Sequence, residues 1–114
     1  MSQPQIISEE QIREAIDTAI AGHRVMLFMK GTPEQPQCGF SARTVQALRT
    51  VDADFAAMNI LPDPRIREVL SQRSEWPTIP QLFVDGEFVG GADITLELFE
   101  SGELAELVKI PTAS

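Results

Sequence analysis

The spacing of apolar residues predicts helices and strands in alternation over the first half of the chain. Residues 8–21 carry isoleucine and alanine on one helical stripe behind a serine–glutamine capping box. Residues 24–29 form a short, continuously apolar run, which is typical of a central parallel strand buried on both faces. Residues 30–37 contain glycine and two prolines and are expected to be a loop, after which helical spacing resumes over residues 40–51. Cys38 therefore lies where a loop turns into a helix.

The second half of the chain continues with elements of both kinds. In order, we expect a half-buried strand, a helix with proline in its first turn, a β-hairpin and two helices, at residues 54–60, 63–76, 81–91, 94–102 and 103–110. Asp85 and Gly86 form the strongest hairpin signal in the sequence. Asp93 is placed to cap the helix that follows.

Length and charge narrow the class of protein. A chain of 114 residues, 43% of them apolar, has room for one domain over residues 1–114, with its core at about 8–109. The net charge of −8 argues against nucleic-acid binding, which needs clustered lysine and arginine, and against anionic membranes. No apolar run approaches the roughly 20 residues that span a bilayer, and the first residues carry no targeting signal. We therefore expect a cytoplasmic protein, or the mature form of a trimmed one.

Cys38 is the only cysteine in the sequence, so it cannot form a disulfide within its own chain. This fits a reducing compartment, in which thiols serve chemistry rather than cross-linking. A cysteine acts as a nucleophile or metal ligand only as the thiolate, whose pKa falls at a helix N-terminus or beside a cation. Cys38 meets the first condition, and Lys30 is placed to meet the second. The alternative is that Cys38 is a small apolar filler and Lys30 a solvated side chain.

Two stretches of the sequence resemble one family. The segment MKGTPEQPQCGFS (29–41) resembles the signature of the monothiol glutaredoxins with a Cys-Gly-Phe-Ser site, and WPTIPQLFVDGEFVGGADI (76–94) resembles that family's second half. The similarity runs from about Ile12 to Leu107. It implies an α/β, thioredoxin-like fold, with a small mixed four-stranded sheet flanked by helices on both faces. The element order predicted above is compatible with that fold.

The resemblance also implies a glutathione site around Cys38, which would be both the catalytic residue and the metal ligand. Lys30 and Arg67 would face the glycine carboxylate of glutathione, where a cation matches the charge. Ile79 would offer main-chain hydrogen bonds to the tripeptide, as a strand does. Pro80 would be the family's cis proline beside the sulfur, rather than an ordinary trans turn residue.

The far end of that site would be the start of a helix. The amides of Ala92 and Asp93 would hold the glutamyl carboxylate, and the Asp93 side chain would take the amine. Simpler alternatives stay open at this point. Arg67 could instead form a surface ion pair with Glu68 or Glu103, and Asp93 could be only a helix cap.

Ser41 excludes the two-thiol reaction cycle, because it stands where dithiol relatives have a second cysteine that resolves the mixed disulfide. The resemblance implies instead a 2Fe-2S cluster held by Cys38 of two chains and by two glutathiones, in a homodimer. Such a carrier would store the cluster, or pass it to acceptor apoproteins or a BolA-like partner in iron homeostasis. Ala92 stands where many members have cysteine, so no second protein thiol exists to form an intramolecular disulfide.

Whether the chain is also an enzyme is left open. In that alternative, the Cys38 thiolate reduces protein–glutathione mixed disulfides and free glutathione resolves the intermediate. A regulatory, partner-binding module would use the same surface. The insertion TPEQP between Lys30 and Cys38 favours the carrier, because a longer loop beside the sulfur could misalign glutathione for attack.

Overall fold

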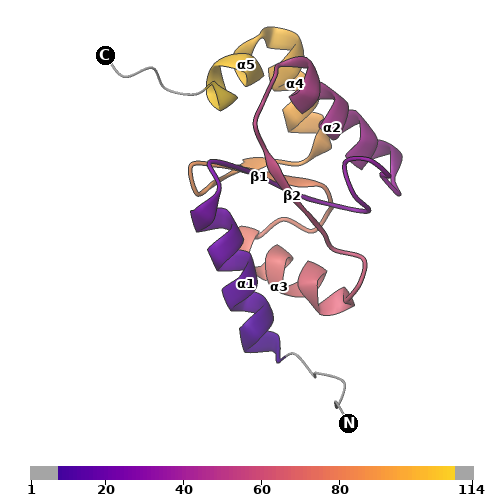
Figure 1. Ribbon diagram of the computed structural model, residues 1–114, viewed down its shortest axis with the longest axis vertical. Helices are drawn as coiled ribbons and strands as arrows, with labels where there is room; N and C mark the ends of the chain where they lie inside the picture. The colour runs from indigo at the N-terminus through magenta and orange to yellow at the C-terminus, as the bar shows by residue number, and fades with distance from the viewer. Residues whose placement is uncertain (1–7, 110–114) are drawn as a thin grey trace.

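The computed structural model describes residues 8–109, which form a four-stranded sheet between two layers of helices (Figure 1). In chain order the elements are α1 (Glu9–Gly22), β1 (Val25–Met29), α2 (Gly39–Thr50), β2 (Ala56–Asn59), α3 (Pro64–Ser74), β3 (Gln81–Val84), β4 (Glu87–Gly90), α4 (Ala92–Ser101) and α5 (Glu103–Val108). The α/β class and the mixed sheet flanked by helices on both faces are confirmed.

The strands follow the order β2–β1–β3–β4 across the sheet. β1 runs parallel to β2 and antiparallel to β3, and β3 and β4 form the predicted hairpin. The expected central strand is therefore confirmed, but it is parallel to one neighbour only. In the hairpin turn, Asp85 and Gly86 have positive φ angles of 53° and 82°, which is the geometry that a two-residue turn requires.

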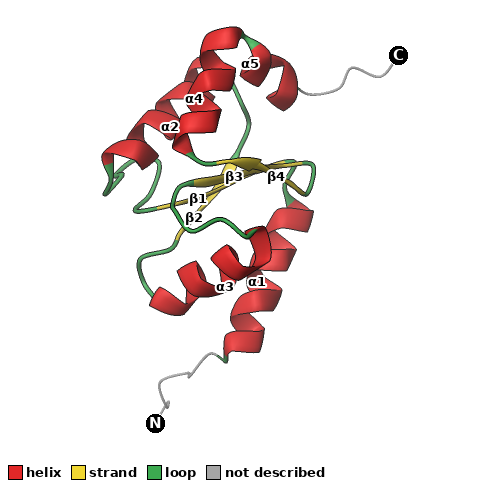
Figure 2. Ribbon diagram, turned by 180° about the vertical axis from the view of Figure 1, so that it is seen from behind, coloured by secondary structure: helices red, strands yellow, loops and turns green. Residues whose placement is uncertain are grey.

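Two cores lie on the two faces of the sheet. α1 and α3 cover one face, while α2, α4 and α5 cover the other (Figure 2). Successive residues of β1 alternate between them, with Phe28 in the first core and Leu27 and Met29 in the second. Phe28 packs edge-to-face against Phe83 of β3, with ring centroids 5.6 Å apart. The sheet therefore holds a fixed frame from which the loops at its ends project.

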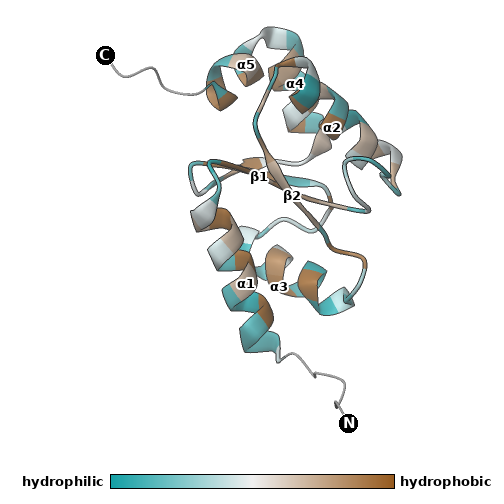
Figure 3. Ribbon diagram, in the orientation of Figure 1, coloured by the Kyte–Doolittle hydropathy of each residue, from teal (hydrophilic) through white to brown (hydrophobic). Residues whose placement is uncertain are grey.

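α1 shows how the apolar pattern becomes packing. Its buried side chains are Ile12, Ile16 and Ile20, and the predicted capping box between Ser8 and Gln11 is formed in both directions. Figure 3 shows the polar residues of α1 and α3 alternating with apolar ones along each helix, as amphipathic helices require. Within residues 8–109, no helix combines the length and apolar character needed to cross a membrane.

The ends of two helices differ slightly from the prediction. α3 has Pro64 in its first turn, as expected, and Asp63 caps it, but the helix ends at Ser74 rather than at residue 76. Glu75 adopts a left-handed conformation with φ of 57°, which stops the helix. The last helix was predicted to reach residue 110, which lies outside the described residues.

The prediction that Asp93 caps α4 is wrong. The cap is Gly91, and Asp93 lies in the first turn of the helix. The Gly91 carbonyl accepts hydrogen bonds from both the N–H and the hydroxyl of Thr95, at 3.0 and 2.8 Å. A side chain at Gly91 would crowd Trp76, because a Cβ there would lie 3.0 Å from the indole Nε1. Close packing therefore selects glycine, which carries no capping side chain for the sequence to reveal.

Candidate functional site

A groove of about 400 Å³ runs along one end of the sheet and contains the only thiol. It is lined by residues that follow β1, begin α2, lie on α3, connect α3 to β3 and begin α4: Lys30, Cys38, Phe40, Arg67, Trp76, Thr78, Ile79, Gly91, Ala92 and Asp93. Every site residue predicted from the sequence is in this set except Pro80, which adjoins it. The fold thus brings together residues that are up to 63 positions apart, from Lys30 to Asp93.

Cys38 is the N-cap residue of α2 and is half-buried. Its side chain makes no capping hydrogen bond. Even so, the backbone N–H of Ser41 lowers the pKa of the Cys38 thiol, and the N–H of Phe40, the charge of Lys30 and the Ser41 hydroxyl act in the same direction. Partial burial opposes them. The net effect favours the thiolate, as expected for a cysteine at a helix N-terminus.

Both main-chain groups of Lys30 are hydrogen-bonded. Its N–H donates to Ser41 Oγ at 3.2 Å, and its carbonyl accepts from the N–H of Gln37 at 2.9 Å. The next amide, that of Gly31, donates to Asn59 Oδ1 at 2.9 Å. Ser41 is fully buried, so its hydroxyl links the end of β1 to the start of α2. Lys30 and Cys38 are therefore fixed relative to one another through the backbone.

The inserted loop between Lys30 and Cys38 has a defined shape. Thr32 and Gln35 exchange backbone hydrogen bonds at 3.0 and 3.2 Å, and Gly31 forms a bridge with Pro36. Gly31 has a φ of 88°, and a Cβ there would lie 2.5 Å from the Gln35 carbonyl oxygen. Only glycine fits this position, so the loop is folded back on itself beside the groove.

Arg67 points its guanidinium toward the segment after its own helix. It donates to the Pro77 carbonyl at 3.3 Å. The alternative of an ion pair with Glu68 or Glu103 is wrong, since among residues 8–109 the ion pairs involve other arginines. The Arg67 side chain is exposed, which leaves most of its donors free for a ligand.

The segment before β3 presents main chain to the groove. The Ile79–Pro80 peptide bond is cis, as the resemblance implied. Ile79 is 7% exposed, and within the described part of the chain no hydrogen bond is recorded for its N–H or carbonyl. The start of α4 supplies further donors, because the first N–H groups of a helix have no intrahelical acceptor. Ala92 is buried there and Asp93 is exposed.

Four lining residues were not predicted as part of the site. Phe40 is 56% exposed beside the cysteine, and Trp76, Thr78 and Gly91 complete the walls. Phe40 follows Cys38 by two residues within the Cys-Gly-Phe-Ser stretch, which was a usable signal. Trp76 and Thr78 lie in the second stretch that resembles the family, but nothing else in the sequence distinguishes Thr78 from any other loop residue.

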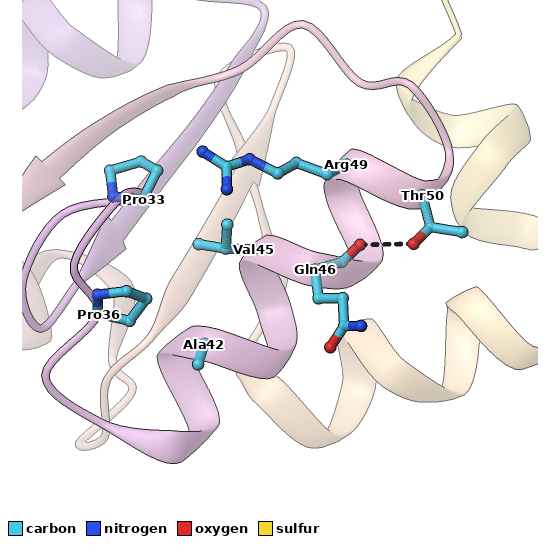
Figure 4. Close-up of a pocket in the computed structure, with 7 residues that line it drawn as sticks. All are labelled: Pro33, Pro36, Ala42, Val45, Gln46, Arg49 and Thr50. Atoms are coloured by element: carbon cyan, nitrogen blue, oxygen red, sulfur yellow. Dashed lines mark hydrogen bonds between the residues drawn. The ribbon is translucent and has the colours of Figure 1, made fainter.

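A second concave surface lies between the inserted loop and α2 (Figure 4). Pro33 and Pro36 of the loop face α2, where Val45 and Arg49 are among the lining residues. Its one ionic group is already paired, because Arg49 contacts Glu34 at 3.3 Å. None of the predicted site residues lines it, so the groove at Cys38 is the candidate site.

The donor set in the groove limits how a metal could be held. Within residues 8–109, no cluster of three or more His, Cys, Asp or Glu side chains could hold a metal ion. An iron–sulfur cluster takes four thiolate ligands, and this chain supplies one. The sulfur is half-buried beside an exposed aromatic ring. One chain alone therefore does not hold such a cluster, and the remaining thiolates would have to come from outside it.

Comparisons with known proteins identify the family of this chain. The glutaredoxin family model matches residues 25–89, which include Lys30, Cys38, Arg67 and the cis proline. The chain is 54% identical over 89 residues to the probable monothiol glutaredoxin GrlA of Legionella pneumophila, covering 78% of this chain and all of that protein. It is 46% identical over 99 residues to the chloroplastic monothiol glutaredoxin-S7 of Oryza sativa, covering 87% of this chain. The chain spans 59% of the length of that rice protein.

A solved structure extends the comparison to three dimensions. The solution structure of reduced poplar apo GrxS14 is 48% identical in sequence and superimposes with a TM-score of 0.75. The match covers 85% of this chain and 89% of that one. The thioredoxin-like fold that the sequence resemblance implied is thereby confirmed.

Proposed function

Because this chain belongs to the glutaredoxin family, among its monothiol members, we propose that it binds glutathione in the groove around Cys38 and, with a second copy, carries a 2Fe-2S cluster as cargo. The observation that carries the proposal is the groove itself. It places one thiol with a lowered pKa among two cationic side chains, a stretch of unpaired main chain and a helix N-terminus.

These groups match the chemistry of glutathione from end to end. Lys30 and Arg67 suit its glycine carboxylate, since charge-assisted hydrogen bonds to a carboxylate are the strong ones. The free main chain of Ile79 suits the peptide bonds of the tripeptide. The amides of Ala92 and Asp93 suit the glutamyl carboxylate at the positive end of α4, and the Asp93 carboxylate suits the neighbouring amine.

The cluster would need ligands from two chains. One Cys38 from each copy and one thiol from each of two glutathiones give the four thiolates that a 2Fe-2S cluster requires. Because half of those ligands are small molecules, the cluster can leave without unfolding either chain. Transfer to acceptor apoproteins, or joint binding with a BolA-like protein, follows from such labile ligation. A single thiol without an internal partner suits a reducing compartment, such as the cytoplasm.

An oxidoreductase is the second candidate, and the lowered pKa of Cys38 favours it as well. In that reaction the Cys38 thiolate attacks the glutathionyl sulfur of a mixed disulfide, and the substrate protein leaves as a thiolate. A second glutathione then attacks the Cys38–glutathione disulfide, which yields oxidised glutathione and restores the Cys38 thiolate. The inserted loop of residues 31–37 favours the carrier instead, because a longer loop folded beside the sulfur misaligns glutathione for attack.

Anaerobic reconstitution with iron, sulfide and glutathione tests the carrier, with visible absorption and native mass as readouts. We expect a coloured dimer that loses both colour and dimerisation when glutathione is removed. The Cys38→Ser variant should stay folded, since a half-buried side chain at a helix start contributes little packing, but it should stay colourless. Colour in that variant would remove Cys38 as the ligand. A colourless parent monomer that reduces glutathionylated substrates would establish the enzyme instead.

A further inference from the structure

Gln81 is a polar side chain at a fully buried position beside the hydrophobic core. It is the first residue of β3 and is 0% exposed, and it is followed by the buried residues Leu82, Phe83 and Val84. It lies on the same face of β3 as Phe83, toward the core under α1 and α3. Burying a carboxamide costs free energy unless its polar atoms find partners, so those partners show what the residue does.

The side-chain amide of Gln81 donates hydrogen bonds to two main-chain carbonyls in the segment that forms one wall of the groove. Nε2 donates to the Trp76 carbonyl at 2.9 Å and to the Thr78 carbonyl at 3.1 Å. The carbonyl between them, that of Pro77, accepts from Arg67. In the described part of the chain, residues 75–80 take part in none of the backbone–backbone hydrogen bonds outside regular elements. Side chains, with Gln81 foremost, therefore hold this segment in place of a backbone ladder.

The remaining polar atom of Gln81 gains nothing for stability. Its Oε1 is buried and has no partner in the structure. A methionine has nearly the same length and shape and would remove this orphaned acceptor, but it would leave the Trp76 and Thr78 carbonyls without their donor. What only the carboxamide supplies is the pair of donors that fixes the carbonyls of Trp76 and Thr78.

We infer that Gln81 is a positioning residue for the ligand groove. By fixing the Thr78 carbonyl, it sets the direction of the Ile79 N–H, which belongs to the same peptide group, and through the Trp76 carbonyl it holds the residue whose ring packs against Gly91. Gln81 itself does not line the groove, so it acts through the segment it holds. The inference rests on the proposed function, in that the ligand positioned is glutathione.

The test compares Gln81→Met with the parent and with Gln46→Met, which makes the same exchange at an exposed site on α2. Reduced glutathione is titrated into 15N-labelled protein well below the melting temperature, and 15N backbone relaxation at Thr78 and Ile79 is measured without ligand. We expect Gln81→Met to bind glutathione about tenfold more weakly, since small misplacements of binding groups are costly. Both amides should have lower order parameters than in the parent, while the Cys38 pKa stays that of the parent. Gln46→Met should match the parent throughout.

A merely structural role would lower the melting temperature and leave the affinity of the folded protein unchanged, and that result would overturn the inference. If the parent itself gives no glutathione-dependent shift at Lys30 or Cys38, the proposed function fails, while the order parameters of Thr78 and Ile79 still decide whether Gln81 holds the segment. Should Gln81→Met not fold, Gln81→Glu serves in its place. A neutral glutamic acid can donate one hydrogen bond, so its affinity relative to the parent should recover as pH falls. If the glutathione affinity of Gln81→Glu relative to that of the parent does not change with pH, the inference is contradicted.

Discussion

Cys38 combines partial exposure with several groups that favour its thiolate. The N–H of Ser41 contributes most, and the charge of Lys30 adds to it. Lys30 in turn keeps its place because its own N–H is bound by the buried Ser41 hydroxyl. Ser41 thus replaces the resolving cysteine of dithiol relatives with a residue that organises the site around the remaining thiol.

Removing the Lys30 charge should raise the pKa of Cys38, because that cation stabilises the thiolate. In the Lys30→Gln variant, the pH profile of iodoacetamide alkylation should therefore move to higher pH than in the parent. Arg49→Gln is the matched control, since Arg49 is exposed and pairs with Glu34 away from the groove. An unchanged profile in Lys30→Gln would show that the lysine does not act on the sulfur.

The lowered pKa of Cys38 also makes the stability of the folded chain depend on pH. Because the folded chain favours the thiolate, it binds fewer protons than the unfolded chain at pH values between the two pKa values. The contribution of Cys38 to stability is therefore present above the unfolded pKa and is lost as pH falls through the folded pKa. At a half-exposed site solvent screens this contribution, so the alkylation profile is the better readout.

At this scale, the sequence located the reactive residues but not the groups that support them. The position of Cys38 at a helix start follows from the pattern of loop and helix alone. The hydrogen bonds of Ser41 and Gln81 do not, because they join residues whose proximity depends on the tertiary fold. The incorrect ion-pair alternative for Arg67 has the same origin, since the Pro77 carbonyl is adjacent only in the folded chain.

Among the elements, the inserted loop has the strictest requirement on one residue. Gly31 combines a positive φ with a close approach to the Gln35 carbonyl, whereas Gly86 has a similar φ of 82° and open space around it. Comparing alanine substitutions at these two glycines therefore separates the cost of backbone strain from the cost of steric crowding.

Gly86→Ala should lower the free energy of unfolding by about 1 kcal/mol, which is the cost of a left-handed alanine. Gly31→Ala should lower it by about 3 kcal/mol, because crowding against backbone atoms adds to that strain. Urea unfolding of both variants measures the difference. Equal losses would mean that the loop relaxes freely and does not brace Lys30.

The elements themselves were largely readable from the sequence. Helical spacing predicted α1, a continuously apolar run predicted β1, and two apolar runs around the turn signal Asp85–Gly86 predicted the hairpin. The start of α4 was not readable, because Gly91 is selected by the nearby Trp76 ring rather than by any local signal. Local patterns thus describe elements well and fail where one element packs closely on another.

Considered as a whole, the molecule gathers its groove from segments that approach one end of the sheet. The acidic chain, with a net charge of −8, places Lys30 and Arg67 on the walls of that groove. Phe40 projects from its rim and is more exposed than any other large apolar residue in the described part of the chain, at 56%. In the cluster-bridged dimer that we propose, this ring would lie beside the shared ligands.

Phe40→Ser should weaken the cluster-bridged dimer, with the dissociation constant rising about tenfold, because exposed aromatic rings are frequent anchors of interfaces. The free energy of unfolding of the monomer should change by no more than about 0.5 kcal/mol, as is usual for exposed positions. Sedimentation of the reconstituted protein measures the first quantity. Leu61→Ser is the control, because Leu61 is 47% exposed but lies outside the groove. Equal effects of both substitutions would place the dimer contact elsewhere.

Trp76 gives this molecule an optical property that needs no label. It is the only tryptophan in the sequence, there is no tyrosine, and its ring forms part of the groove wall against Gly91 and Phe88. Nearly all ultraviolet emission excited at long wavelength therefore comes from one position beside the thiol. Quenching of that emission would report the arrival of a peptide, a metal cluster or a second chain in real time, so stopped-flow mixing can order these events on the unmodified protein.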